Sequence, residues 1–130
     1  MGELTAALRR AMELAGDDPA RAVEELERAL ENARGRVDPR EISAVARHAA
    51  VICESLGDFG RAIRYYEEAI AGDPEAALLH LAIGGVHAQR QAPDRARKNY
   101  RRCLSLAESA GDHDLAAVAS GAIKRLDGAS

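Results

Sequence analysis

The feature that most constrains the fold is a spacing pattern that occurs in three separate segments of the chain. The segments are PARAVEELERAL (19–30), FGRAIRYYEEAI (59–70) and PDRARKNYRRCL (93–104). Each has Arg-Ala at its third and fourth positions, a large residue four positions later and a small residue three positions further on. Self-similarity at a period of roughly 20 to 50 residues indicates a repeat architecture, in which stacked units bury one another's apolar faces.

Apolar residues recur at helical spacing along nearly the whole chain, and short groups of Gly, Asp and Pro interrupt them. Pro19 and Pro93 suit the first turn of a helix, and Asp38 suits an N-cap position. The segment 75–90 is apolar nearly all round, which predicts a helix packed on several sides. The pattern as a whole predicts seven helices joined by short connections, and no strand.

Composition favours close-packed helices over sheets. Hydrophobic residues make up 47% of the 130 residues, aromatic residues only 3%, and there is no Trp. A core of Ala, Leu and Ile with few aromatic residues suits helices that approach one another closely. A chain of this length is most simply one domain, here residues 1–130, which buries about two-thirds of its unfolded surface.

Charge, cysteine content and hydropathy limit where in the cell the protein is expected and which partners it is expected to bind. The net charge of -3 is mild and implies neither a nucleic-acid nor a membrane partner by itself. Cys53 and Cys103 lie far apart on apolar stripes, which predicts buried thiols in a reducing compartment rather than a disulfide. No apolar run suits a signal peptide or a membrane span. We therefore expect a cytoplasmic protein that does not bind a membrane.

The best-preserved copy of the pattern, FGRAIRYYEEAIAGDP (59–74), resembles the second helix of a tetratricopeptide repeat. It supplies Ala62, Tyr66, Ala69 and Pro74 at the matching positions, and Ile83-Gly84 is similar to the Leu-Gly pair of the first helix. The resemblance implies an all-α right-handed superhelix of three helix pairs, at about 2–34, 39–73 and 75–108, with a capping helix at about 112–127. The first interval, from Ala22 to Ala62, is 40 residues, longer than the 34 from Ala62 to Ala96.

The tetratricopeptide resemblance implies a protein-interaction module that binds a peptide or a partner protein in a concave groove. The first helix of each pair lines such a groove, and its stripe opposite the core gives the candidate site. The candidate residues are Arg47, His48, Val51, Glu54, Leu78, Leu81, Gly85, Ala88, Gln89 and Lys124. The apolar members could instead contact a neighbouring helix.

A second candidate surface is the basic segment 89–103. It contains Arg95, Arg97, Lys98, Arg101 and Arg102, which Asp94 alone opposes. The favoured reading is a solvated outer face. The alternatives are a docking patch for an acidic protein, contact with the acidic segment 24–31 of a second copy, which would make a homo-oligomer, and, less favoured, nucleic-acid binding without interleaved aromatic residues.

No residue pattern points to catalysis, a metal or another cofactor. His80 and His87 share a helix face, but no Cys, Asp or Glu shares it, so packing histidines are expected rather than zinc ligands. Gly84 has a packing explanation, whereas Gly85 has none. Tyr65 lies one residue off the packing register, and its role stays open at this level. We expect no enzyme activity.

Overall fold

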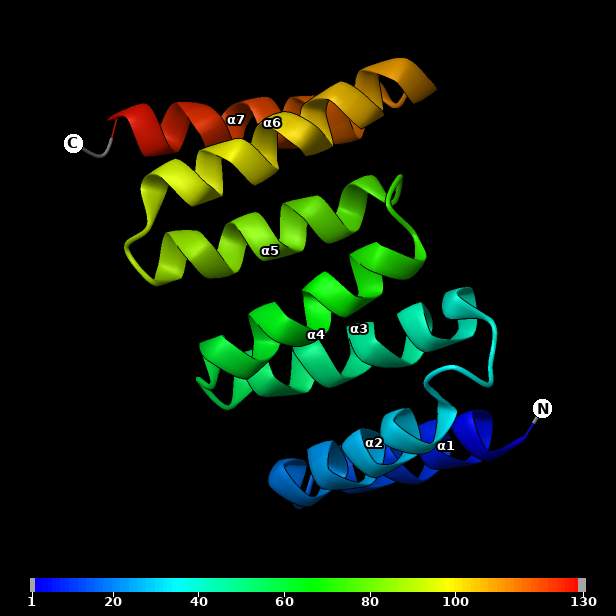
Figure 1. Ribbon diagram of the computed structural model, residues 1–130. Coiled ribbons are helices and arrows are strands. Elements are labelled where there is room, and N and C mark those ends of the chain that lie inside the picture. The colour runs from blue at the N-terminus through cyan, green and yellow to red at the C-terminus, as the bar shows by residue number, and fades with distance from the viewer. Residues whose placement is uncertain (1, 129–130) are drawn as a thin grey trace. The chain divides into compact units, whose positions relative to one another are not determined.

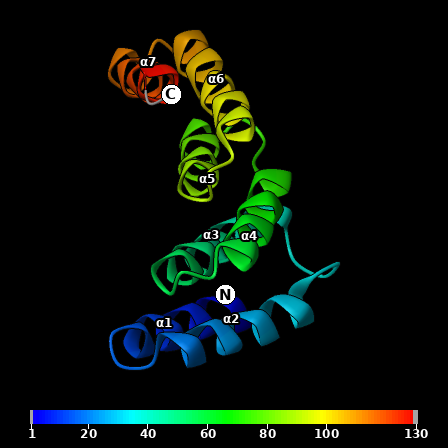
Figure 2. The same ribbon diagram turned by 90° about the vertical axis from the view of Figure 1, so that its left-hand side faces the viewer.

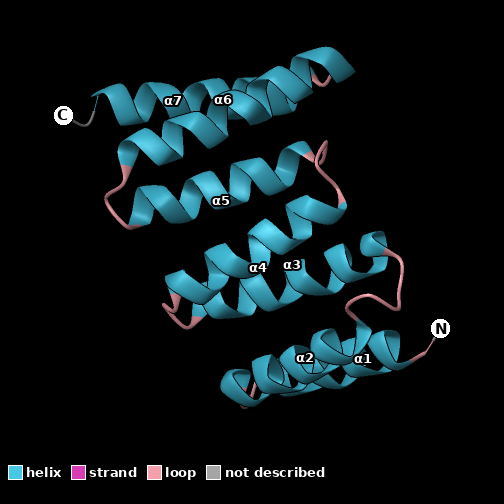
Figure 3. Cartoon of the chain, viewed as in Figure 1, coloured by secondary structure: helices cyan, strands magenta, loops and turns pink. Residues whose placement is uncertain are grey.

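The protein is described here by a computed structural model that covers residues 2–128, and in that range it contains helices and no strand (Figure 3). This confirms the all-α expectation. None of the described helices is both long and apolar enough to cross a membrane. The helices are α1 (Glu3–Ala15), α2 (Pro19–Ala33), α3 (Pro39–Ser55), α4 (Phe59–Gly72), α5 (Ala77–Gln89), α6 (Pro93–Ala110) and α7 (His113–Gly128).

The helices fall into two compact units, one ending at Pro74 and the other beginning at Glu75. In the first unit, α1 packs against α2, α3 packs against α4, and α3 also contacts both helices of the preceding pair (Figure 1). In the second unit, α6 lies between its two partners in the chain, α5 and α7, and packs against both (Figure 2). The expected repeat bounds and the single-domain organisation stay predictions.

Aspartate side chains define where three of the helices in the first unit begin. Asp18 accepts a hydrogen bond from the backbone N–H of Arg21 at 3.2 Å, and Asp58 accepts one from Arg61 at 3.3 Å. Asp38 accepts one from the backbone N–H of Arg40 at 2.8 Å. Each carboxylate satisfies an N–H that has no partner inside its helix, which is the usual role of an N-cap aspartate. The predicted N-cap at Asp38 is therefore confirmed.

The repeated Ala residues mark the places where paired helices approach closely. Ala22, Ala62 and Ala96 are completely buried. The large residues one turn later are also buried, namely Leu26, Tyr66 and Tyr100. Of the small residues that follow them, Ala69 and Cys103 are buried and Ala29 is half-buried. A small residue beside a large one lets two helix backbones approach without leaving a void, so the spacing read from the sequence is the spacing of the core.

Gly84 allows α5 and α6 to approach each other closely. A Cβ atom at this position would lie 2.7 Å from two ring carbons of Tyr100, on the facing helix α6. Tyr100 then forms a cluster with Ala96 and Ala122, which joins α6 to α7. The packing explanation predicted for Gly84 is confirmed, and the same tyrosine ring that fills the space beside α5 also contacts the last helix.

Helix α5 differs from the expectation in where it begins. It begins at Ala77 rather than near Glu75, and its N-cap residue Ala76 has no side chain that can cap it. Leu78 has 59% of its surface exposed, which agrees with its place in the predicted stripe opposite the core. Helix α7 runs on to Gly128, one residue beyond the expected end at about 127. These differences leave the number and order of the helices unchanged.

Candidate functional site

The exposed face of α3 carries the first group of predicted groove residues. Arg47 and Val51 are exposed and His48 is half-buried, while their neighbours Ala46, Ala49 and Ala50 are buried. Residues three and four apart lie on one face of a helix, so Ala44, His48 and Val51 form one stripe. The structure therefore keeps this stripe out of the core, as the sequence predicts.

A surface pocket lies at the N-terminal end of this stripe. Its volume is about 380 Å³, and it is formed by α1, the end of α2, the connection after it and the start of α3. Apolar surface makes up most of its lining, and polar side chains make up the rest. The lining residues are Glu3, Leu4, Thr5, Leu8, Ala29, Asn32, Ala33, Arg36, Val37, Glu41, Ala44 and Val45. Concave, mostly apolar pockets with a few polar groups are typical ligand sites.

Further along α1 and α3, each of the two helices carries a large exposed apolar side chain. Met12 follows Leu8 by one helical turn and has 59% of its surface exposed. Val51 follows Ala44 by two turns and has 52% of its surface exposed. We call the set Leu8, Met12, Ala44, His48 and Val51 the α1/α3 surface. Large exposed apolar side chains beside a pocket commonly mark places where another molecule docks.

Two polar side chains on α3, His48 and Glu54, are constrained by the groups around them. Burial, with a further contribution from the Arg47 guanidinium, holds the pKa of His48 below its usual range. His48 is therefore a neutral imidazole near pH 7, able both to donate and to accept a hydrogen bond. Glu54 accepts a hydrogen bond from the Tyr66 hydroxyl at 2.9 Å, so this predicted groove carboxylate also holds a core tyrosine in place.

The other predicted groove residues belong to the second unit. Leu78 and Gln89 are exposed on α5, Gly85 is half-buried there, and Lys124 is exposed on α7. Leu81 and Ala88 pack against the cluster of Ala96, Tyr100 and Ala122. The sequence leaves open whether the apolar groove residues contact a neighbouring helix instead of a partner. Leu81 and Ala88 make such a contact. A continuous groove through all of these residues stays a prediction.

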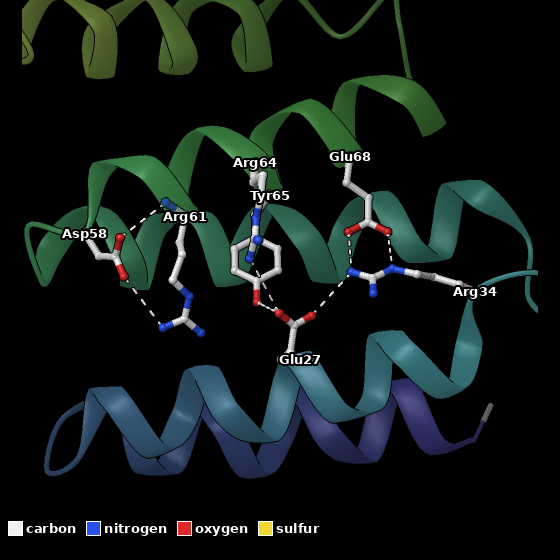
Figure 4. Close-up of polar contacts among 7 residues, drawn as sticks. All are labelled: Glu27, Arg34, Asp58, Arg61, Arg64, Tyr65 and Glu68. Carbon is white, nitrogen blue, oxygen red and sulfur yellow. Dashed lines mark hydrogen bonds and ion pairs between the residues drawn. The ribbon is translucent and has the colours of Figure 1, made fainter.

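Tyr65, whose role the sequence leaves open, joins α4 to α2. Its side chain is buried, and its hydroxyl donates a hydrogen bond to Oε1 of Glu27 at 2.6 Å (Figure 4). Burial and this hydrogen bond raise the pKa of Tyr65 to about 12. The partner is 38 residues away in the sequence, so no local pattern could have revealed the pair.

A bidentate ion pair extends the same polar network. The Nε and Nη2 atoms of Arg34 lie 2.7 and 2.8 Å from the two carboxylate oxygens of Glu68, and Nη2 is also 3.4 Å from Glu27 (Figure 4). Arg64 approaches Glu27 at 3.8 Å. These side chains line a pocket of about 450 Å³ between α2 and α4. Since most of its charges already have partners within the first unit, we assign this pocket to holding the two helix pairs together.

The predicted basic patch is divided by the structure into two groups. Arg97 is largely covered and pairs with Asp127 of α7 at 2.9 Å and with Asp94 at 3.0 Å. Asp94 is therefore not the sole carboxylate that opposes the basic segment, because Asp127 of α7 also pairs with Arg97. Arg95, Lys98, Arg101 and Arg102 are exposed on α6.

The thiol and imidazole groups of the described residues do not assemble into a reactive site. Cys53 and Cys103 are free thiols, completely buried, and burial raises the pKa of each. A protonated, inaccessible thiol is a poor nucleophile. His80 and His87 are both buried in α5. No group of three His, Cys, Asp or Glu side chains within residues 2–128 is placed to hold a metal ion.

The fold and the repeated Ala-large-small packing define the class of this protein, which is an all-α helical-repeat protein. Residues 47–78, which include all of α4, match the family model of the tetratricopeptide repeat. This segment therefore matches a tetratricopeptide repeat, in agreement with the resemblance read from the sequence. A comparison with curated protein sequences found no match.

Solved structures with the same fold are distant in sequence. The structure of PcrH in complex with the chaperone binding region of PopB has a TM-score of 0.70 and 17% identity, over 94% of this chain and 97% of that one. The structure of MamA has a TM-score of 0.68 and 16% identity, over 95% and 76% of the two chains. BtubC from P. vanneervenii has a TM-score of 0.59 and 22% identity, over 85% and 57%. At such identities the likeness shows the fold alone.

Proposed function

We propose that this protein is a protein-interaction module that binds a segment of a partner protein on the α1/α3 surface. The observation that carries the proposal is that Met12 and Val51 stay exposed on the two helices whose N-terminal halves line the apolar pocket. An apolar side chain of the partner would enter the pocket. The rest of the segment would then lie along Met12, His48 and Val51.

Charges around the apolar surface would orient the partner. Arg36 and Glu41 are among the residues that line the pocket, and Arg47 is exposed beside the stripe on α3. Apolar anchors give such an interface most of its affinity, and rim charges mainly select the partner and its direction. A helix laid in a groove and an extended segment are both compatible with a surface of this kind.

The comparisons support binding of this general type. The PcrH structure, which has the same fold, contains the chaperone binding region of PopB, so a protein segment is bound in that complex. Fold likeness alone does not identify a partner, and the surface proposed here rests on the residues of this chain. The groove residues predicted in the second unit, from Leu78 to Lys124, are proposed separately as partner contacts of that unit. The proposal includes no catalytic step.

The experiment that tests the proposal selects peptides and then changes one exposed valine. Peptides would be selected from a random displayed library on the unaltered protein, and their affinity would be measured for Val51→Asp and Val118→Asp. Val118 is a matched control, because it is 51% exposed on α7, against 52% for Val51. We expect Val51→Asp to weaken the selected peptides by at least about tenfold, since it places a charge on an apolar contact, and Val118→Asp to leave them bound.

The two variants also need a folding control. Both substitutions are at exposed positions, so helicity measured by circular dichroism should equal that of the unaltered protein. Failure to select any peptide, or peptides that bind Val51→Asp and Met12→Asp as tightly as the unaltered chain, would contradict the assignment of the α1/α3 surface.

A further inference from the structure

The outer side of α6 carries four cations without a counter-charge in the part of the chain that the structure describes. Arg95, Lys98, Arg101 and Arg102 are exposed, and none of them forms a salt bridge with a carboxylate among residues 2–128. Arg97 on the same helix pairs with Asp127 and Asp94. The fold thus uses one cation of this helix internally and leaves the other four to solvent or to a partner.

The four cations are arranged as one short stripe. Arg95, Lys98 and Arg102 follow one another at intervals of three and four residues, and Arg101 is three residues after Lys98. Side chains at these intervals are neighbours on a helix surface, and like charges there repel one another. With a rise of about 1.5 Å per residue, the stripe is about 10 Å long. A bound anion of matching length would relieve the repulsion.

The surroundings of the stripe favour a protein segment over nucleic acid or a membrane. Single-stranded nucleic acid commonly stacks its bases on exposed aromatic rings, and the tyrosine of this helix, Tyr100, is buried. An interfacial membrane helix inserts its apolar side, but Ala96, Cys103 and Ala107 of α6 are already buried in the core. An extended chain advances by about 3.3 Å per residue, so roughly four acidic residues span the length of the stripe.

We propose that the outer face of α6 binds an acidic, extended segment of a partner protein. The carboxylates of the segment pair with Arg95, Lys98, Arg101 and Arg102. The site is independent of the α1/α3 surface, because its residues lie on a different helix and in the other unit. Binding at α6 depends on charge, and it therefore weakens as salt screens the pairs.

The test measures fluorescence anisotropy with a fluorescein-labelled decaglutamate peptide at low salt. The variant Lys98→Glu/Arg102→Glu reverses two charges of the stripe. The matched control Arg9→Glu/Arg40→Glu makes the same charge change at two exposed arginines of the first unit. We expect the α6 variant to lower the affinity by at least about tenfold, and the control and Val51→Asp to change it by less than about twofold. Lys98→Gln/Arg102→Gln should lose affinity as well.

Further measurements distinguish an acidic protein segment from nucleic acid and from a second copy of this chain as the ligand of the stripe. Labelled decaglutamine should not bind, and decaglutamate should be released as the salt concentration is raised. Equal losses in the α6 variant and its control would overturn the proposal, as would absence of decaglutamate binding at low salt. Tighter binding of a ten-nucleotide polyuridylate would assign the stripe to nucleic acid instead. Salt-sensitive self-association in light scattering, abolished by the α6 variant, would assign it to a second copy of this chain.

Discussion

The hydroxyl of Tyr65 lies 2.6 Å from a carboxylate oxygen of Glu27, and this hydrogen bond connects the second helix of one pair to the second helix of the next. Glu27 also faces Arg34 at 3.4 Å and Arg64 at 3.8 Å. One carboxylate thus receives a buried tyrosine and two arginines from two helices. This arrangement ties the position of α4 to α2 more specifically than apolar packing alone would do.

Tyr65→Phe tests the contribution of that hydrogen bond. The ring stays, the hydroxyl is lost, and the Glu27 carboxylate keeps its arginine neighbours. We expect the free energy of unfolding in urea to fall by about 1 to 2 kcal/mol, because the bond has a charged acceptor and is partly buried. A double-mutant cycle with Glu27→Gln isolates the pair, and additive losses would show that the two side chains do not interact in solution.

Alkaline titration tests the burial of the tyrosines. Burial and the bond to Glu27 raise the pKa of Tyr65 to about 12, and burial likewise raises the pKa of Tyr66 and Tyr100. Because the folded-state pKa values lie above the unfolded value of about 10, the associated stability is fully present below pH 10. It is lost as the pH rises through the folded-state values.

The measurement is the ultraviolet absorbance of tyrosinate, to which the three tyrosines of this Trp-free chain are the sole contributors. We expect tyrosinate to form at higher pH in the folded protein than in the unfolded chain, and its rise to accompany loss of helicity. A titration near pH 10 with helicity unchanged would contradict the burial of these hydroxyl groups.

Neighbouring glycines in α5 provide a matched pair of substitutions. In Gly84→Ala the new Cβ would lie 2.7 Å from the Tyr100 ring, and we expect a loss of about 1 to 3 kcal/mol in the free energy of unfolding. In Gly85→Ala the nearest such atom is the Tyr100 hydroxyl oxygen at 3.9 Å. That variant should gain up to about 1 kcal/mol from helix propensity. Denaturant melts in which both variants shift stability alike would rule out the close approach of α5 to α6.

Two alanines of α4 test the repeat register in the same way. Ala62 is completely buried at a helix crossing, whereas Ala71 is exposed one residue before the end of the helix. Ala62→Arg should lower the free energy of unfolding by about 4 kcal/mol or more, because it inserts a long charged side chain into a packed contact. Ala71→Arg should change it by less than about 0.5 kcal/mol. Thermal melts measured by circular dichroism compare the two variants directly, and an unchanged melting temperature for Ala62→Arg would reject the register.

The packing of the helix pairs could be predicted from the sequence because it depends on residues close together in the chain. Ala62, Tyr66 and Ala69 lie on one helix, and their spacing alone places them on one face. The N-cap at Asp38 likewise depends only on residues next to it in the sequence. The contact between Tyr65 and Glu27 depends instead on how two helix pairs are rotated against each other, which the spacing within one helix does not contain.

The candidate site could be predicted only in part, for a related reason. The α3 stripe around Val51 is exposed as expected, since the opposite face of α3 is filled with alanines. The same rule places Leu81 and Ala88 in the groove and leaves contact with a neighbouring helix open, and both side chains contact the cluster around Tyr100. Helix α5 is apolar on almost every side, so the sequence pattern does not distinguish its core side from its outer side. The pocket beside Ala44 also depends on the long connection after α2, whose path the sequence does not fix.

The buried thiols have a practical consequence for following how this protein opens. Cys53 lies in α3, in the first unit, and Cys103 lies in α6, in the second, and these are the two cysteines of the chain. An alkylating reagent reaches a buried thiol when the surrounding helices separate, so the rate of modification at each cysteine measures local opening of its own unit. Mass spectrometry of the two cysteine-containing peptides would read both rates in one experiment, with no cysteine introduced by mutation. The chain therefore carries a built-in reporter on each side of Pro74.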